Sequence, residues 1–281
     1  MSALRDLSYQ SRRFVPLPLL LRIGRRRAAK LWATEAFREA AETNMRYLLE
    51  NTERADEVPQ LAEEYLEYEV LRNYRRWHAK PILTQPVEGI EWLTTKRDPD
   101  RGVVVNFMHH AQYGGMIGSV AHAGALVRAV VAPEAFDPKT EIQLRQHYKL
   151  CGAVPEAPLV STAEGTAGMA KILENRENLL IASDVAGRTP VRFLGKEIGF
   201  SIGAAVLAVR TNSPVVLMTF HPDAAGESTI RLHEPFEPGD FAGPEEVLAE
   251  IFRRHEPAVL AWPTAYDSPY GRLELARQAS G

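Results

Sequence analysis

Short apolar runs separated by segments of helical spacing recur along the last two thirds of the chain. The first run, Gly102–Met108, contains three consecutive valines and follows the turn-forming residues Asp98–Arg101. Similar runs lie at Leu126–Val131, Leu179–Ala182 and Pro214–Phe220. Consecutive β-branched residues are typical of strands covered on both faces, and strands that alternate with helices form α/β folds. We therefore predict a mostly parallel or mixed central sheet flanked by helices.

The beginning of the chain has a different pattern and predicts an α-rich segment. Ala, Leu, Glu and Arg dominate from Arg25 to Tyr74, where apolar side chains recur at helical spacing, as in Leu61, Tyr65, Tyr68 and Leu71. No internal repeat, low-complexity tract or long polar linker divides the chain. Because α/β folds of roughly 200–250 residues routinely form one domain, we predict a single domain over residues 1–281, with a helical N-terminal part at 1–80 and an α/β core at 81–281.

The apolar run Phe14–Leu21 is followed by a cluster of basic residues, namely Arg22, Arg25, Arg26, Arg27 and Lys30. The run is too short to span a bilayer, which takes about 20 apolar residues. A secretory signal would also carry its charges before the apolar run. Apolar groups beside arginines suit the surface of an anionic membrane, so residues 12–30 are a candidate for peripheral membrane contact. The alternative is a segment packed on the protein with a solvated basic face.

Composition narrows the class of partner. The chain is 45% hydrophobic and 25% charged, and its formal net charge of -3 gives no general attraction to nucleic acid. Cys151 is the only cysteine, which excludes an intramolecular disulfide and a site built from several thiolates. We therefore expect a cytoplasmic protein that binds no nucleic acid, and no sequence motif predicts a metal or another cofactor.

Two adjacent histidines, His109 and His110, follow the run Gly102–Met108 directly. Ligands of open α/β sheets bind beyond the carboxyl ends of the strands, and imidazole can take a proton from a hydroxyl or amine and return it to a leaving group. Gly114 and Gly115, four and five positions after His110, permit close approach of the backbone to a ligand. The alternative is a pair of histidines satisfied by local hydrogen bonds. No serine elbow, phosphate-binding loop or paired-histidine zinc motif is present.

Three parts of the chain carry an order of motifs that is found in one group of enzymes. In the first, GVVVNFMHHAQYGG (Gly102–Gly115), a strand leads to a histidine, and an aromatic residue follows four positions later. The second joins Leu179–Asp184 to Val191–Val216, with a Phe-Leu-Gly motif, a Gly-Ala helix and a Pro-Val strand. The third comprises Leu17–Gly24 and His255–Trp262. These stretches resemble the bacterial lipid A late acyltransferases and the phosphatidylinositol mannoside acyltransferases, within the lysophospholipid acyltransferase-like superfamily.

The resemblance assigns roles to residues after the first strand. With Tyr113 aligned to the family's aromatic residue, His109 takes the place of the catalytic histidine, and Gly114 takes that of an acid five positions later. Starting from His110 instead places Gly115 there, so neither register holds a carboxylate. In the family the acid orients the imidazole and stabilises its protonated form, as in related triads. Tyr113 and Gly114 are accordingly expected at the substrate, and His110 is one candidate for the role of the missing acid.

Asp184 is the strongest candidate for a replacement acid. It follows the predicted strand Leu179–Ala182, as His109 follows its own strand, so both side chains could share one edge of the sheet. The alternative for Asp184 is a structural role, as a helix cap or as an ion-pair partner of Arg188.

The resemblance implies acyl transfer without a covalent enzyme intermediate. His109 would deprotonate a hydroxyl or amine of a lipid or small-molecule acceptor, which would attack the thioester of an acyl carrier protein or acyl-CoA. Backbone N–H groups around Gly114–Gly115, or an arginine, would stabilise the oxyanion. Arg145 lies where the family often carries a functional arginine, and Arg188 and Arg192 are candidates for binding a phosphate of donor or acceptor. Each arginine has the alternative of an ordinary surface residue.

Two other functions are compatible with the missing acid. One is a binding protein that keeps an acyl groove after the loss of catalysis. The other is altered thioester chemistry, such as hydrolysis or acyl transfer in a specialised biosynthetic pathway. A lipid acceptor would place the protein in the cytoplasm at the inner face of the membrane.

Overall fold

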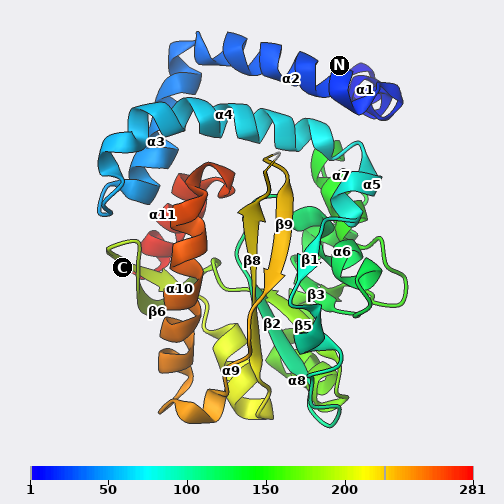
Figure 1. Cartoon of the computed structure of the whole chain (residues 1–281), viewed down its shortest axis with the longest axis vertical. Coiled ribbons are helices and arrows are strands. Elements are labelled where there is room, and N and C mark those ends of the chain that lie inside the picture. Colours follow the sequence, from blue (N-terminus) through cyan, green and yellow to red (C-terminus); the bar gives the residue numbers. More distant parts are fainter. Residues whose placement is uncertain (1, 225, 281) are drawn as a thin grey trace.

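The computed structural model describes residues 2–224 and 226–280 of the chain, and side chains within 6–224 and 226–274. A seven-stranded sheet forms the centre of this described part (Figure 1), in the order β1-β9-β8-β2-β5-β3-β4. Neighbouring strands are parallel except β8 and β9, which are antiparallel. The strands are β1 (Val87–Glu88), β2 (Val103–Phe107), β3 (Arg128–Val131), β4 (Val160–Ser161), β5 (Asn178–Ala182), β8 (Val215–Pro222) and β9 (Ser228–Leu232). The predicted α/β class, with its mixed and mostly parallel sheet, is confirmed.

Each of the four apolar runs contains a strand, and β2 lies between β5 and β8. All five residues of β2 are buried. Val104 packs with α8 (Gly165–Glu174), α9 (Gly203–Thr211) and α10 (Pro244–Ala261) on one face, whereas Val103 and Val105 pack with α6 (Met116–His122) on the other. Because both rows of side chains are covered, the strand reads as an unbroken apolar run. The helices of the α/β part are α6 (Met116–His122), α7 (Ile142–Cys151), α8 (Gly165–Glu174), α9 (Gly203–Thr211), α10 (Pro244–Ala261) and α11 (Pro269–Ser280).

A two-stranded antiparallel hairpin outside the central sheet is a feature that the sequence pattern did not predict. It consists of β6 (Ala186–Phe193) and β7 (Lys196–Phe200). Leu194 and Gly195 between them both have positive φ, 53° and 74°, as in a two-residue type I′ turn. A Cβ at Gly195 would also lie 2.4 Å from the carbonyl oxygen of Asn51. The Phe-Leu-Gly motif therefore forms the turn of this hairpin, and its glycine packs closely against Asn51 of the N-terminal part.

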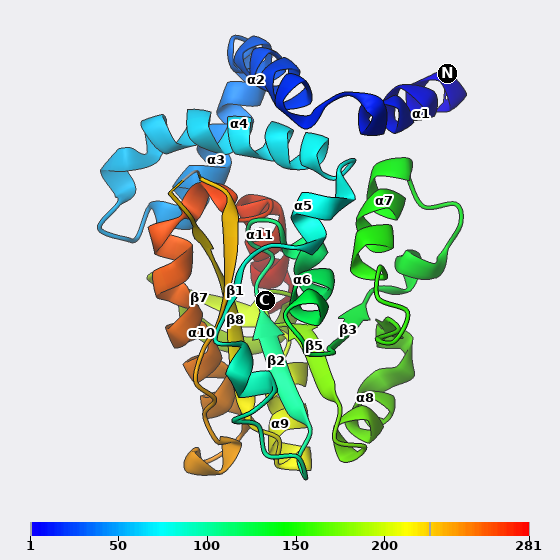
Figure 2. The ribbon, with the colours of Figure 1, turned by 45° about the vertical axis from the view of Figure 1, so that its right-hand side comes forward.

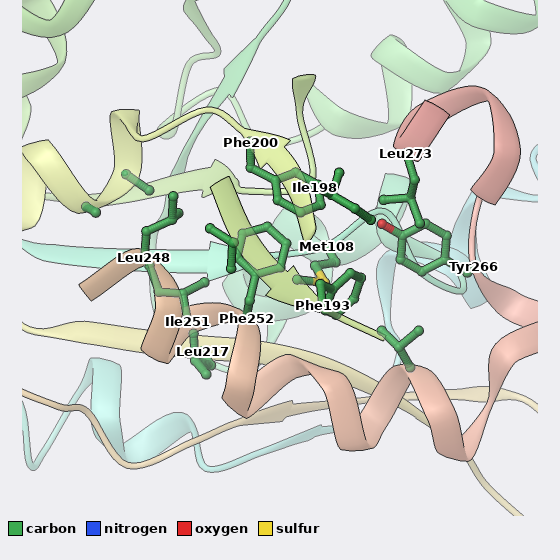
Figure 3. Packing of buried hydrophobic residues seen from close by; sticks show 14 of the residues in the cluster. Met108, Phe193, Ile198, Phe200, Leu217, Leu248, Ile251, Phe252, Tyr266 and Leu273 are labelled. Carbon is green, nitrogen blue, oxygen red and sulfur yellow. The ribbon is translucent and has the colours of Figure 1, made fainter. Parts of the chain in front are cut away.

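Aromatic side chains form the middle of the core on this side of the sheet (Figure 3). Phe200 of β7 stacks on Phe252 of α10 with ring centres 4.1 Å apart, and Phe193 of β6 meets Phe252 edge-on at 5.1 Å. Tyr266 and Leu273, from the C-terminal segment, lie at one end of the same cluster. Because Tyr266 is fully buried, the segment after α10 is fixed against the core.

The N-terminal part is helical and lies across one end of the sheet. Its helices are α1 (Ser2–Ser11), α2 (Leu17–Trp32), α3 (Glu35–Leu49), α4 (Val58–Arg75) and the short α5 (Ala79–Leu83). Figures 1 and 2 place α2 and α4 beyond the end towards which β2 and β8 point. Met45, Leu48 and Leu61 belong to the same hydrophobic cluster as Phe193 and Phe252. The α-rich N-terminal segment is confirmed, and it shares a core with the α/β part.

One face of α2 packs on the protein and the other is exposed. Leu20, Gly24 and Ala28 are buried, and α2 contacts α4. On the opposite face, Leu19 and Ile23 are 51% and 43% exposed. The basic residues of this region are exposed as well, namely Arg22, Arg25, Arg26, Arg27 and Lys30. Among the described residues, no helix has both the length and the apolar character needed to cross a membrane.

Candidate active site

A cavity of about 560 Å³ opens where β2, β3 and β5 end. Its wall also includes residues of α7, α8 and α9, and its apolar lining comprises Phe107, Met116, Ala129, Val131, Leu144, Met169, Ile181 and Leu207 among others. Five larger polar side chains line it too, those of His109, Tyr113, His147, Tyr148 and Arg272. The volume lies within the range of roughly 300–1,000 Å³ that is usual for small-molecule sites. Ligands of open α/β sheets bind at this end, so the cavity is the candidate active site.

His109 and Asp184 form a hydrogen-bonded pair beside this cavity. Asp184 Oδ1 lies 2.7 Å from His109 Nδ1, and Asp184 Oδ2 accepts from the backbone N–H of His109 at 2.9 Å. Phe107 of β2 pairs with Ala182 of β5, so the residues two positions later, His109 and Asp184, leave neighbouring strands at the same level. The hydroxyl of Tyr266 donates to the same Oδ2 at 2.9 Å. The carboxylate is therefore held by three donors.

The environment of Asp184 keeps it ionised. Burial by itself would raise the pKa of this carboxyl group, but the charge and hydrogen bond of His109, together with Arg272, hold the pKa well below its usual value. An ionised carboxylate can only accept hydrogen bonds, so Nδ1 of His109 carries the proton. The lone pair of the imidazole is then at Nε2. His109 is 18% exposed and lines the cavity, as a general base must.

A second carboxylate, the partly buried Asp267, connects the residues around this pair. Its Oδ2 accepts from the hydroxyl of Tyr113 at 2.7 Å and from Arg272 Nη2 at 2.9 Å, and its Oδ1 pairs with Arg72. Its backbone N–H donates to the carbonyl oxygen of His109 at 2.9 Å. Although burial opposes ionisation, Arg72, Arg272 and the Tyr113 hydroxyl hold the pKa of Asp267 well below its usual value. Asp267 therefore anchors both the backbone of His109 and the ring of Tyr113.

Tyr266, Asp267 and Arg272 were missed by sequence reasoning. The third resembling stretch ends at Trp262, and the residues after it carry no motif that marks them as part of a site. Pro269 is a residue favoured at the first position of a helix, and it is the sequence signal for the start of α11. It predicts the helix but not the site that the helix reaches.

The structure does not bring His110 to the cavity. His110 is buried, its Nε2 bonds to the carbonyl oxygen of Trp262 at 2.8 Å, and its ring faces Phe220 and Trp262. Burial lowers the pKa of His110 to about 4, with only partial compensation from that hydrogen bond. A neutral imidazole that points away from His109 cannot take the role of the missing acid. Its Nε2 bonds instead to a backbone carbonyl oxygen 152 positions along the chain.

The three arginines named by resemblance lie outside the cavity wall. Arg145 is exposed on α7 and its Nη1 lies 3.4 Å from the carbonyl oxygen of Pro138. Arg188 is exposed on β6, and the carboxylate of Asp184 bonds to His109 and Tyr266 instead. Arg192 lines a separate open hollow on the outer side of α10. The structure therefore gives none of these arginines a place at the reacting groups.

The two glycines after the histidines accommodate neighbouring protein groups rather than a ligand. A Cβ at Gly114 would lie 2.8 Å from Nδ1 of His147, and a Cβ at Gly115 would lie 2.1 Å from the carbonyl oxygen of Ile82. The backbone N–H of Gly115 donates to the carbonyl oxygen of Gln112 at 3.1 Å, so it is not free for an oxyanion. The place of the family's acid is thus taken up by the imidazole of His147.

Cys151 lies on the cavity wall beside His147, with 3.6 Å between Sγ and Nε2 of that histidine. Burial raises the pKa of the thiol to about 12 and lowers the pKa of His147 well below its usual value. Both groups are therefore neutral, which does not favour a thiolate nucleophile. Among the described residues, no group of three or more His, Cys, Asp or Glu side chains is placed to hold a metal ion.

No protein-family model matches the chain, and no curated protein matches its sequence. Among solved structures, the chain is similar to the 1-acyl-sn-glycerophosphate (LPA) acyltransferase PlsC from Thermotoga maritima, with 15% identity and a TM-score of 0.45. The similarity covers 95% of this chain and 100% of that one.

Proposed function

We propose that the protein transfers an acyl group from a thioester to a hydroxyl or amine, with His109 as general base and Asp184 as the carboxylate that orients it. The observation that carries the proposal is the pair itself, joined at 2.7 Å beside a mostly apolar cavity. A carboxylate behind the imidazole fixes its tautomer and stabilises its protonated form. Asp184 reaches His109 from the neighbouring strand, so a carboxylate at position 114 is not required.

The reaction follows from the protonation states of the pair. Nε2 of His109 takes the proton of the acceptor hydroxyl or amine as the acceptor atom forms its bond to the thioester carbonyl carbon. The resulting imidazolium is stabilised by the ionised Asp184. When the tetrahedral intermediate collapses, the carbon–sulfur bond breaks and the departing sulfur takes the proton from His109. The products are the acylated acceptor and the free thiol, and His109 returns to its starting state.

The walls of the cavity favour a substrate with an apolar chain. The lining comes mainly from aliphatic and aromatic side chains, which stabilise a buried acyl chain by about 25 cal/mol per Å² of apolar surface removed from water. An acyl carrier protein or acyl-CoA supplies such a chain as a thioester. Tyr113 supports the base, since the rings of Tyr113 and His109 pack in a T-shaped arrangement with 4.9 Å between ring centres.

A lipid acceptor is favoured by the surface near the N-terminus. Phe14 is 75% exposed, and it lies with Leu19 and Ile23 in the basic region 12–30. Figure 2 places α1 above α7, and the two helices are in contact; α7 forms part of the cavity wall. Apolar and basic side chains together suit the interface of an anionic bilayer. We include in the proposal that this region contacts the membrane from the cytoplasmic side.

The experiment is a comparison of wild type with His109→Ala on a panel of acyl thioesters and alcohol or amine acceptors. Thiol release and acylated product are measured together. Loss of a general base lowers the rate by about 10²–10⁴-fold, so the rate of acyl transfer by His109→Ala should be lower than that of wild type by at least this factor. His122→Ala, an exposed histidine that does not line the cavity, is the matched control and should keep the wild-type rate.

The same assay separates the alternatives. Thiol release without an acylated acceptor would replace transfer by thioester hydrolysis. An acyl chain that stays bound to a wild type without turnover would make the protein a binding protein. A His109→Ala variant as active as wild type would refute the assignment of the base.

A further inference from the structure

Arg272, in the first turn of α11, is the only arginine or lysine among the described residues that line the cavity. Its side chain is 26% exposed, so part of the guanidinium group faces the cavity. Burial opposes its charge, but Asp184 and Asp267 raise the pKa of Arg272 above its usual value. The cavity therefore contains one permanent positive charge in a mostly apolar wall.

Two hydrogen bonds hold this guanidinium group from one edge. Nη2 donates to Asp267 Oδ2 at 2.9 Å, and Nε donates to the backbone carbonyl oxygen of Asp267 at 3.0 Å. Neither of these two hydrogen bonds uses Nη1. A planar guanidinium fixed along one edge presents its remaining N–H groups in a defined direction. Arg272 is thus oriented before a substrate arrives.

The same contacts place Arg272 close to the base. Asp267 Oδ2 accepts from both Arg272 and the Tyr113 hydroxyl, and the Tyr113 ring lies against His109. Asp267 also donates its backbone N–H to the carbonyl oxygen of His109. The guanidinium of Arg272 and the backbone of His109 are therefore both hydrogen-bonded to Asp267, and both residues line one cavity. Attack on a carbonyl group requires a base near the attacking atom and a cation near the carbonyl oxygen, so both groups must lie in one cavity.

We propose that Arg272 is a catalytic residue that stabilises the oxyanion of the tetrahedral intermediate, an inference that rests on the proposed acyl transfer. As the acceptor atom bonds to the carbonyl carbon, the carbonyl π pair moves onto the oxygen, and an N–H of Arg272 donates to it. When that pair re-forms the double bond, the carbon–sulfur bond breaks and the sulfur takes its proton from His109. A charged donor in a site with little water stabilises this oxyanion strongly.

Other donors suggested by the sequence fit this role less well. The N–H of Gly115 is already used by the carbonyl oxygen of Gln112, and Arg145 does not line the cavity. An anionic group on the acceptor is the competing partner for Arg272. The two partners differ in timing, because an acceptor's anion is present in the ground state whereas the oxyanion exists only during the reaction.

The kinetic test compares Arg272→Gln and Arg272→Lys with wild type. If Arg272 contacts only the oxyanion, Arg272→Gln should lower kcat by about 10²–10³-fold with little change in KM, and Arg272→Lys should recover part of that loss. The fold should survive, because Asp267 keeps its contacts with Arg72 and Tyr113; thermal unfolding checks this. Arg210→Gln, an exposed arginine that does not line the cavity, is the matched control.

A binding test separates charge stabilisation from a structural role. An acyl phosphonate carries the negative charge of the tetrahedral intermediate, whereas the matching acyl ketone is neutral. Arg272→Gln should lose affinity for the phosphonate by about the factor lost in kcat and keep its affinity for the ketone. Equal losses for both ligands would overturn the proposal in favour of a structural role. A higher KM for an anionic acceptor with unchanged kcat would overturn it in favour of acceptor binding.

These outcomes are independent of the test of the base. A rate that survives in His109→Ala would remove the proposed base, yet the ratio of phosphonate to ketone affinities would still report on Arg272. Wild type that binds neither analogue would overturn both assignments.

Discussion

Replacing Asp184 by asparagine exchanges one carboxylate oxygen for an amide NH₂ group and keeps the shape of the side chain. In the structure, Oδ2 accepts from two donors, the backbone N–H of His109 and the hydroxyl of Tyr266. The backbone N–H cannot turn away, so the amide oxygen of asparagine must take the place of Oδ2. The amide NH₂ then faces Nδ1 of His109, which must offer its lone pair. The proton of the neutral imidazole therefore moves to Nε2, where a base needs a lone pair.

The size of this effect follows from the role of the carboxylate. An amide in this place both enforces the wrong tautomer and removes the charge that stabilises the imidazolium, and in a Ser-His-Asp triad the same exchange lowers kcat by about 10⁴-fold. We expect a loss of about 10²–10⁴-fold in kcat for Asp184→Asn, with KM changed far less. Single-turnover thiol release with a saturating acyl thioester measures it, beside Asp240→Asn as an exposed control. A folded Asp184→Asn variant within a few fold of the wild-type rate would refute the proposed pairing.

Three further predictions concern stability. Asp267→Ala removes one partner of the buried Arg72 and should cost about 3 kcal/mol of unfolding free energy in urea, near the lower end for a buried ion pair because Glu69 still pairs with Arg72 at 2.6 Å. The pKa of Asp267 is lowered in the folded state, so its contribution to stability is present above the ordinary aspartate pKa of about 4 and is lost as the pH falls below it. Asp267→Asn should therefore flatten the acid limb of the curve of unfolding free energy against pH. An unchanged acid limb would contradict this prediction. Gly114→Asp should cost about 1–3 kcal/mol because its Cβ would lie 2.8 Å from Nδ1 of His147. The cost should be smaller in the His147→Ala background, and strictly additive losses would show that the two positions are not in conflict.

The strand-and-loop part of the site was accessible to sequence reasoning. The run Gly102–Met108 predicts a buried strand, and the structure has β2 at Val103–Phe107. The run Leu179–Ala182 predicts that Asp184 follows a strand and shares a sheet edge with His109, and in the structure Asp184 Oδ1 lies 2.7 Å from His109 Nδ1. This worked because parallel strands have their carboxyl ends at one edge of a sheet, a rule that depends only on local patterns and topology.

The arginines show where that reasoning stopped. Resemblance named Arg145, Arg188 and Arg192, whereas the cavity contains Arg272. The position of a long surface side chain depends on which helix packs against which, and the local sequence does not encode this. Similarly, the hairpin of β6 and β7 depends on positive φ at Leu194 as well as Gly195, and leucine gives no turn signal.

The sequence by itself determined the α/β class, the buried strand before His109 and the absence of a carboxylate at position 114. Tertiary structure alone decided how that absence is met. The segment after α10 is held by the buried Tyr266. The hydroxyl of Tyr266 bonds to Asp184, and the ion-paired guanidinium of Arg272 lines the cavity. The contact between Tyr266 and Asp184 joins residues that are 82 positions apart. Such contacts arise from the packing of a whole core, so no local pattern could specify them.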